Sequence, residues 1–124
     1  MFKPQTLFPT SIYQAMHPKA SVINPVLRAR ILELRGTSAA QNKSMRGGWQ
    51  SRRDFLIAGD PVSEALLKLV DIGIRTASAH HAAADPRSTR LEYELISWAN
   101  CSGAGDYNLV HDHPMSSWSA VYYV

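Results

Sequence analysis

Two histidines separated by one residue are the side chains of this sequence best suited to chemistry. They are His111 and His113, in the stretch His111-Asp112-His113-Pro114. On a β-strand, residues two apart point to the same side and lie about 7 Å apart along the backbone, so both imidazoles can approach one metal ion while Asp112 points away. Imidazole suits iron, zinc, copper and nickel, so the pattern leaves the metal open, and it also fits two ordinary loop histidines beside a proline.

The other candidate groups have simpler interpretations. His80 and His81 are neighbours near the end of a predicted helix, about 100° apart around its axis, so they cannot chelate as a same-face pair and instead suit the helix C-terminus. His17 precedes a proline and is interpreted as a loop residue. Cys101 is the only cysteine, which excludes an intramolecular disulfide and fits a reducing cytoplasm.

Basic residues gather around the pair Gly47-Gly48. This glycine pair does not belong to a P-loop, because the lysine and the helix start of that motif are missing. Such a cluster could meet phosphate or an anionic substrate. We favour a solvated, charged loop and do not expect nucleic-acid binding, because no aromatic residues are interleaved with the charges. The cluster consists of Lys43, Arg46, Arg52 and Arg53.

Two helices are predicted before residue 90. Asn24 and Pro25 give an N-cap followed by a proline at the first helical position, and Gly36 ends this helix, which therefore covers residues 25–35. Asp60 and Pro61 repeat the starting signal for a second helix, which runs to about residue 81. Apolar residues at helical spacing line one face of each helix: Val26, Leu27, Ile31 and Leu34 in the first, and Leu66, Leu67, Val70, Ile74 and Ala77 in the second.

The periodicity changes from helical to alternating after residue 90, where Leu91, Tyr93 and Leu95 alternate with glutamates. We predict antiparallel strands over residues 91–98, 107–113 and 118–124, and an edge strand or extended arm over residues 7–13. Helices followed by strands indicate an α+β fold with the helices packed on the outer side of the sheet. The chain is then one domain, with a helical and loop part in residues 1–90 and the first core strands in residues 91–124.

Composition limits the class of protein. The 124 residues are 45% hydrophobic and 19% charged, with a net charge of +3, which is ordinary for one globular domain. No run of about 18 apolar residues occurs, so we expect no membrane-spanning helix and no membrane partner. The first residues lack the apolar region and cleavage site of a secretory signal, so we expect a cytoplasmic protein.

Five segments form an ordered set of motifs: Phe8-Pro9-Thr10-Ser11, Arg46-Gly47-Gly48-Trp49-Gln50-Ser51, Trp98-Ala99-Asn100, Tyr107-Asn108-Leu109-Val110-His111-Asp112-His113-Pro114 and Ser119-Ala120-Val121-Tyr122-Tyr123-Val124. This set resembles a family of bacterial and phage 2-oxoglutarate/iron(II)-dependent oxygenases. That family has a Gly-Gly-Trp-Gln-Ser loop, a Trp-Asn strand, a Tyr-Asn pair, a His-x-His-Pro motif and a Ser-Gly-Val-Tyr-Tyr-Val strand. The resemblance covers nearly the whole chain, and the ordered set is more specific than any one motif.

The resemblance implies an oxidoreductase, a dioxygenase that binds Fe(II) and 2-oxoglutarate in a double-stranded β-helix, or jelly roll, and hydroxylates a substrate that the sequence does not identify. His111 matches the first metal ligand of the family. His113 stands where the common motif has a carboxylate, which departs from the triad of two histidines and one carboxylate and leaves Asp112 as an alternative ligand if the strand bulges there. The candidates for contacting 2-oxoglutarate are Tyr107, Asn108 and Tyr122, which carry groups that can donate hydrogen bonds to a carboxylate. The two tyrosines could equally serve only in packing.

The same resemblance places a distal histidine, the third ligand, and a basic residue for the far carboxylate of 2-oxoglutarate after Val124. Three predicted strands are also few for a barrel of about eight, and the last of them would present an aromatic edge. We therefore expect the chain to stop before the fold is complete and to be inactive alone. Two alternatives stay open: a cupin-like metal-binding domain that uses the same His-x-His strand, and a non-catalytic remnant or interaction module that completes its sheet as a homodimer.

Overall fold

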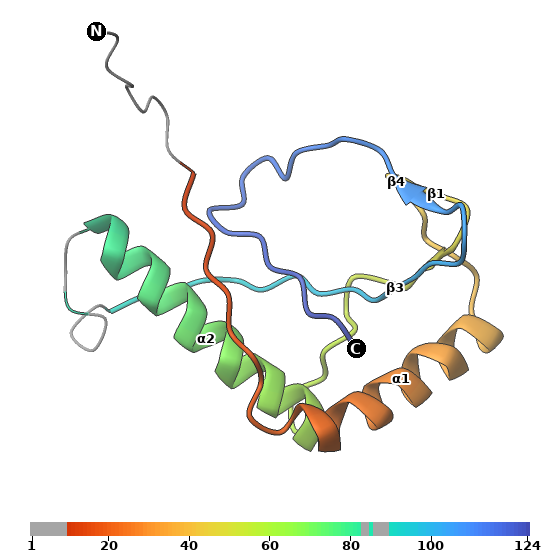
Figure 1. Ribbon diagram of the computed structural model, residues 1–124, viewed down its shortest axis with the longest axis horizontal. Helices are drawn as coiled ribbons and strands as arrows, with labels where there is room; N and C mark the ends of the chain where they lie inside the picture. Colours follow the sequence, from red (N-terminus) through yellow and green to blue (C-terminus); the bar gives the residue numbers. More distant parts are fainter. Residues whose placement is uncertain (1–9, 83–84, 86–89) are drawn as a thin grey trace, which may run out of the picture.

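Two helices start side by side and then diverge (Figure 1). The computed structural model describes residues 10–82, 85 and 90–124. Helix α1 spans Ala20–Thr37 and helix α2 spans Pro61–Ala82. The strands within the described residues are short: β1 (Met45–Arg46), β2 (Trp49–Gln50), β3 (Asn100–Cys101) and β4 (Tyr107–Asn108). The predicted α+β class is confirmed as a mixture of helices and small antiparallel sheets.

The start of α2 follows the sequence prediction. The carboxylate of Asp60 accepts a hydrogen bond from the backbone N–H of Ser63 at 2.7 Å, and its carbonyl accepts from the N–H of Glu64 at 2.9 Å. Glu64 completes the cap, since its carboxylate accepts from the N–H of Gly59 at 3.1 Å. This reciprocal arrangement satisfies donors that a helix start otherwise leaves without partners.

The start of α1 differs from the prediction. The helix begins at Ala20, so Pro25 lies inside it rather than at its first position. The N-cap is Lys19, whose side chain makes no capping hydrogen bond. His17 holds the first turn instead, because its Nδ1 accepts from the Lys19 N–H and its carbonyl accepts from the Ala20 N–H, both at 3.0 Å.

The earlier start of α1 has a packing reason. It places Ile23 one turn before Leu27, and both side chains are buried. Val26, which the prediction put on the inner face, is instead exposed. An internal proline removes one backbone hydrogen bond from the helix, and burial of an additional large apolar side chain offsets that loss. Asn24, predicted as the cap, accepts a hydrogen bond from Tyr122 at 2.7 Å.

The end of α1 also lies beyond the predicted one, because the helix continues through Gly36 to Thr37. Gly36 is not among the glycines with positive φ, so it does not form a left-handed cap. The hydroxyl groups of Thr37 and Ser38 donate to backbone carbonyls of the last turn at 2.9 and 2.7 Å. These bonds satisfy carbonyls that a helix end leaves open.

The two small sheets join the middle of the chain to its last third. β1 pairs with β4 in antiparallel fashion, with Met45 opposite Asn108, and β2 pairs likewise with β3, with Trp49 opposite Cys101. Figure 1 shows β1 and β4 together at the end of the molecule that lies above the C-terminal end of α1. Residues 37–59, whose sequence pattern predicts a long loop with a possible short strand, therefore contain the hydrogen-bonding partners of the later strands.

The strands predicted over residues 91–98, 107–113 and 118–124 are largely wrong. Within the described residues, β4 is all that forms of the second and none forms over the third, while the first contributes only a parallel bridge from Ser97 to Asp54. Alternation of apolar and polar residues indicates which way side chains would point in a strand, but it does not supply a neighbouring strand to hydrogen-bond with. Without such a neighbour, Tyr93 and Ile96 keep 44% and 50% of their surface exposed. Of the predicted arm, residues 7–9 lie outside the described part, and residues 10–13 form no strand.

The core lies where the two helices start. Its buried members are Ile23, Leu27 and Leu66, with Phe55, Leu56, Val62, Ala65 and Tyr122 packed against them. Beside it, the guanidinium of Arg30 donates two hydrogen bonds to the carboxylate of Asp60, at 2.7 and 3.0 Å. These bonds hold the pKa of the Asp60 carboxyl well below its usual range.

Candidate functional site

The imidazoles of His111 and His113 lie next to each other. Their centroids are 4.9 Å apart and their planes meet at 77°, an edge-to-face contact. The two residues follow β4 in a segment without regular secondary structure, not on the predicted strand. His113 is half-buried and His111 is exposed.

One nitrogen of His111 is fixed by the backbone. Nδ1 lies 2.7 Å from the carbonyl oxygen of Leu109, and since a carbonyl can only accept, Nδ1 must be the protonated nitrogen. In the neutral ring, Nε2 then carries the lone pair that a metal ion needs. Nε2 lies 3.5 Å from the hydroxyl of Ser44, which is too long for a strong hydrogen bond. A backbone carbonyl that orients the second nitrogen is a common feature of metal-binding histidines.

His113 rests on the indole of Trp98. The ring centroids are 5.7 Å apart and the planes are tilted by 43°. Trp98 is half-buried, and with the Gln50 amide oriented to suit its neighbours, the side-chain oxygen of Gln50 accepts from Trp98 Nε1 at 2.8 Å. The guanidinium of Arg53 lies 5.7 Å from the centroid of the same indole. Trp98 therefore links the histidine pair to the segment that follows β2.

The backbone that carries the pair is held by the turn between β1 and β2. Gly47 and Gly48 both have positive φ, 69° and 61°, a conformation that other residues rarely adopt. A Cβ on Gly47 would overlap the carboxylate of Asp106, which accepts a hydrogen bond from the N–H of Gly103 at 2.7 Å. The glycine pair thus lets β1 approach the residues before β4. Just after β4, the Leu109 N–H donates to the carbonyl of Ser44, the residue before β1, at 2.8 Å.

The three predicted contacts for 2-oxoglutarate fall in two places. Tyr107 and Asn108 form β4, immediately before the histidine loop, and both are exposed, Tyr107 at 58%. Tyr122 belongs to the helix core: its hydroxyl donates to Asn24 and its ring meets His17 edge to face at 6.3 Å. Burial raises the pKa of Tyr122. The structure thus places Tyr107 and Asn108 on the strand that leads to the pair, and gives Tyr122 a packing environment.

The predicted metal ligands do not form a complete metal site within the described residues. Asp112, the alternative ligand, is exposed. Among residues 10–82, 85 and 90–124, no three His, Cys, Asp or Glu side chains are grouped closely enough to hold a metal ion. The described residues therefore supply a pair of adjacent imidazoles, and a complete site needs a further ligand from elsewhere.

Sequence reasoning missed the role of His17. Its ring is buried, with Nε2 3.2 Å from the carbonyl of Ala65 and Nδ1 accepting from the Lys19 N–H. Because one nitrogen donates and the other accepts, the neutral ring ties the start of α1 to α2. The pattern His17-Pro18 gave no such signal, since the partner carbonyl lies on a distant helix.

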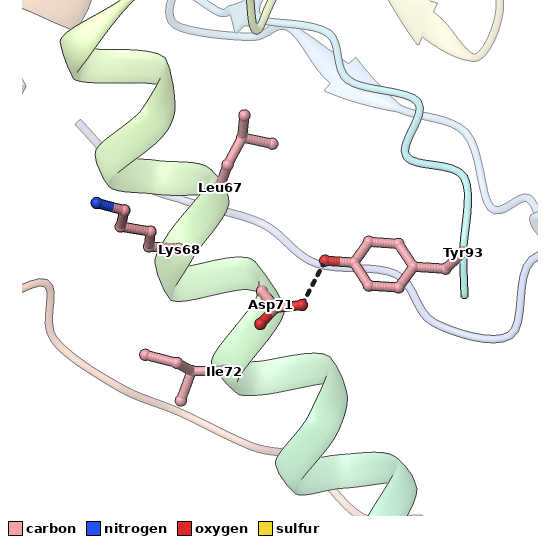
Figure 2. Close-up of a pocket in the computed structure, with 5 residues that line it drawn as sticks. All are labelled: Leu67, Lys68, Asp71, Ile72 and Tyr93. Atoms are coloured by element: carbon pink, nitrogen blue, oxygen red, sulfur yellow. Dashed lines mark hydrogen bonds between the residues drawn. The ribbon is translucent and has the colours of Figure 1, made fainter. Parts of the chain in front are cut away.

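A shallow pocket of about 430 Å³ beside α2 was also missed. Figure 2 shows the hydroxyl of Tyr93 reaching the carboxylate of Asp71, a hydrogen bond of 2.9 Å. Asp71 also accepts from Arg75 at 2.8 Å, the main reason that its pKa is lowered. The remaining lining residues are Leu67, Lys68 and Ile72. Since the Asp71 carboxylate already has two hydrogen-bond partners, we interpret the hydrogen bond from Tyr93 as a structural contact that holds residues 91–98 against α2.

Comparison of the chain with protein-family models, with curated proteins and with solved structures gives no match. The resemblance of the sequence motifs therefore stays a prediction. In the part of the chain that the structure describes, no helix has both the length and the apolar character needed to cross a membrane.

Proposed function

We propose that this chain contributes the His-x-His part of the metal site of an iron(II)- and 2-oxoglutarate-dependent oxygenase. The observation that carries the proposal is the contact between the two imidazoles, 4.9 Å between centroids, together with the Nδ1–H of His111 held on the Leu109 carbonyl. The order of the sequence motifs around the pair supports iron and 2-oxoglutarate over other metals and cosubstrates.

In this proposal the chain positions ligands and the bound groups supply the oxidation. Iron(II), 2-oxoglutarate and O₂ together provide the oxidising power for hydroxylation. His111 would hold the metal through Nε2, and His113 would hold it through a ring nitrogen while its ring contacts Trp98. The exposed Tyr107 and Asn108 on β4 offer a hydroxyl and an amide that can donate to a carboxylate. The third ligand and the jelly-roll closure are part of the proposal by resemblance alone.

The proposal is tested by adding iron(II) and 2-oxoglutarate to the chain without oxygen. Chelation of 2-oxoglutarate to a protein-bound iron(II) gives a visible charge-transfer absorption. We expect this band with the wild-type chain and its loss in both His111→Ala and His113→Ala. Glutarate, which lacks the keto group, is the matched control and must give no band.

Two outcomes would contradict the proposal. One is a band of equal strength in both alanine variants, which would place the iron elsewhere. The other is metal binding through the pair with no response to 2-oxoglutarate, which would instead favour the cupin-like metal-binding domain.

A further inference from the structure

A pocket of about 310 Å³ lies between the segment before β1 and the segment that starts at the end of β2. Three of its lining residues are cationic and none is acidic. The lining consists of Gln41, Lys43, Gln50, Ser51, Arg52 and Arg53. A concave site with charge of one sign attracts ligands of the opposite sign more strongly than a flat surface does.

The positive charge of this pocket is only partly compensated. Arg52 lies 3.6 Å from the carboxylate of Asp54, and both side chains are largely exposed. Neither Lys43 nor Arg53 has an ion-pair partner among the described residues. Two full charges are therefore left for a ligand. One of them is a guanidinium, which can bind a carboxylate or a phosphate through two parallel hydrogen bonds.

Hydrogen bonds fix the uncharged residues of the pocket lining. The Gln41 N–H donates to the Gln50 carbonyl at 2.8 Å, and the Gln50 amide nitrogen donates back to the Gln41 carbonyl at 2.9 Å. The hydroxyl of Ser51 accepts from the N–H of Ala99 at 2.9 Å and donates to the carbonyl of Arg52 at 2.7 Å. Lining residues that already make these bonds lose little conformational freedom when a ligand binds.

Trp98 connects this pocket to the histidine pair. Its Nε1 donates to the Gln50 side chain at 2.8 Å, and its ring contacts both Arg53 and His113. A ligand held by Arg53 would therefore lie near the indole that also contacts the proposed metal ligand His113.

We infer that this pocket binds the anionic group of a small organic substrate, a carboxylate or a phosphate ester, and holds the molecule beside the histidine pair. Lys43 and Arg53 neutralise the charge, and the remainder of the molecule extends past Arg53 toward Trp98, which contacts that guanidinium from outside the pocket lining. The word substrate rests on the proposed function, whereas anion binding itself does not require the metal.

The test uses the metal-free chain, so that anion binding is measured apart from the oxygenase proposal. Glutarate and inorganic phosphate are titrated at constant ionic strength while the NMR signals of the Trp98 indole N–H and the Gln50 side-chain amide are followed. We expect saturable shifts of both signals. Arg53→Gln and Lys43→Gln should each weaken binding at least about fivefold, since each removes a charged hydrogen-bond donor.

Arg28→Gln is the matched control, because it removes the same charge from an exposed position on α1. It should leave the affinity unchanged. Shifts that do not saturate, or an Arg28→Gln variant that weakens binding as much as Arg53→Gln, would overturn the inference.

Comparison of the two anions identifies which anionic group the substrate carries. Tighter binding of glutarate identifies a carboxylate substrate, and tighter binding of phosphate identifies a phosphorylated one. A single-stranded oligonucleotide that shifts the same two signals at far lower concentration than either small anion would overturn the assignment to a small molecule.

Discussion

The indole of Trp98 contacts the imidazole of His113 on one side of the histidine pair, with ring centroids 5.7 Å apart. A metal ion on His113 would therefore lie within a few ångströms of a tryptophan. Trp98 is thereby a built-in reporter for the proposed site, and the other two tryptophans of the chain serve as references.

We predict that Co²⁺, which quenches nearby fluorescence, lowers the emission of Trp98 on binding. Trp98→Phe should remove most of the quenching, because it removes the fluorophore beside His113. Trp118→Phe should preserve it. The ring centroids of Trp118 and His81 are 5.2 Å apart. Quenching that disappears in Trp118→Phe and survives in Trp98→Phe would therefore place the ion at the end of α2 and contradict the assignment of the metal to His113.

Gly47→Ala should destabilise the chain by more than about 1 kcal/mol, because an added Cβ meets the Asp106 carboxylate in a backbone conformation with positive φ. Gly73→Ala is the control. Gly73 lies within α2 with no atom within 4 Å of an added Cβ, so alanine there should stabilise the helix by about 1 kcal/mol. Thermal unfolding of both variants measures the difference, and equal midpoints would refute the proposed role of the turn.

Asp60→Asn should lower the unfolding midpoint, because the amide cannot replace the charged contact with Arg30. The sign of the pH dependence follows from the lowered pKa of Asp60. A carboxyl whose pKa is depressed by folding stabilises the protein above its unfolded value of about 4, and this contribution is lost as the pH falls below that value. Unfolding midpoints between pH 7 and pH 3 should therefore fall more steeply for the wild type than for the variant.

Asp54→Asn is the control for this prediction. Its carboxylate lies 3.6 Å from Arg52, and its side chain is 70% exposed, so its loss should change the midpoint little. Parallel pH profiles for the wild type and Asp60→Asn would show that the Arg30 contact contributes nothing measurable.

Tyr122→Phe should cost about 1 kcal/mol, the usual contribution of one hydrogen bond, because its hydroxyl donates to Asn24. Combining it with Asn24→Ala should add less than the sum of the single changes, since both remove the same bond. Burial raises the pKa of Tyr122, so stability should also fall as the pH rises above about 10, where the unfolded phenol ionises. An unchanged stability together with a weakened response to 2-oxoglutarate would instead favour its predicted contact with the cosubstrate.

The sequence predicted α2 well because its signals are local. Asp60 and Pro61 fix the start through contacts within a single turn. Asn24 and Pro25 carry the same pattern and yet do not start α1, since burial of Ile23 against α2 extends the helix toward the N-terminus. That contact depends on a residue far along the chain, which local pattern does not contain.

The candidate site was predicted in part. The residue types of His111 and His113 were sufficient to identify the pair, but the contact of His113 with Trp98 and the link through Gln50 join three separate segments. The strands predicted around the pair were mostly wrong, because alternating side chains do not specify a hydrogen-bonding partner. The actual partners are in residues 44–51, part of a segment predicted as a long loop with a possible short strand.

The most direct test of the account is the iron(II) affinity of the chain and three variants, measured without oxygen by competition with a chelator of known affinity. We expect His111→Ala and His113→Ala each to weaken binding at least about tenfold, since even supporting groups around a metal site cost that much. Asp112→Ala should have a far smaller effect. Unchanged affinity in either histidine variant, or a larger loss in Asp112→Ala, would contradict the assignment of the histidine pair as the metal ligands.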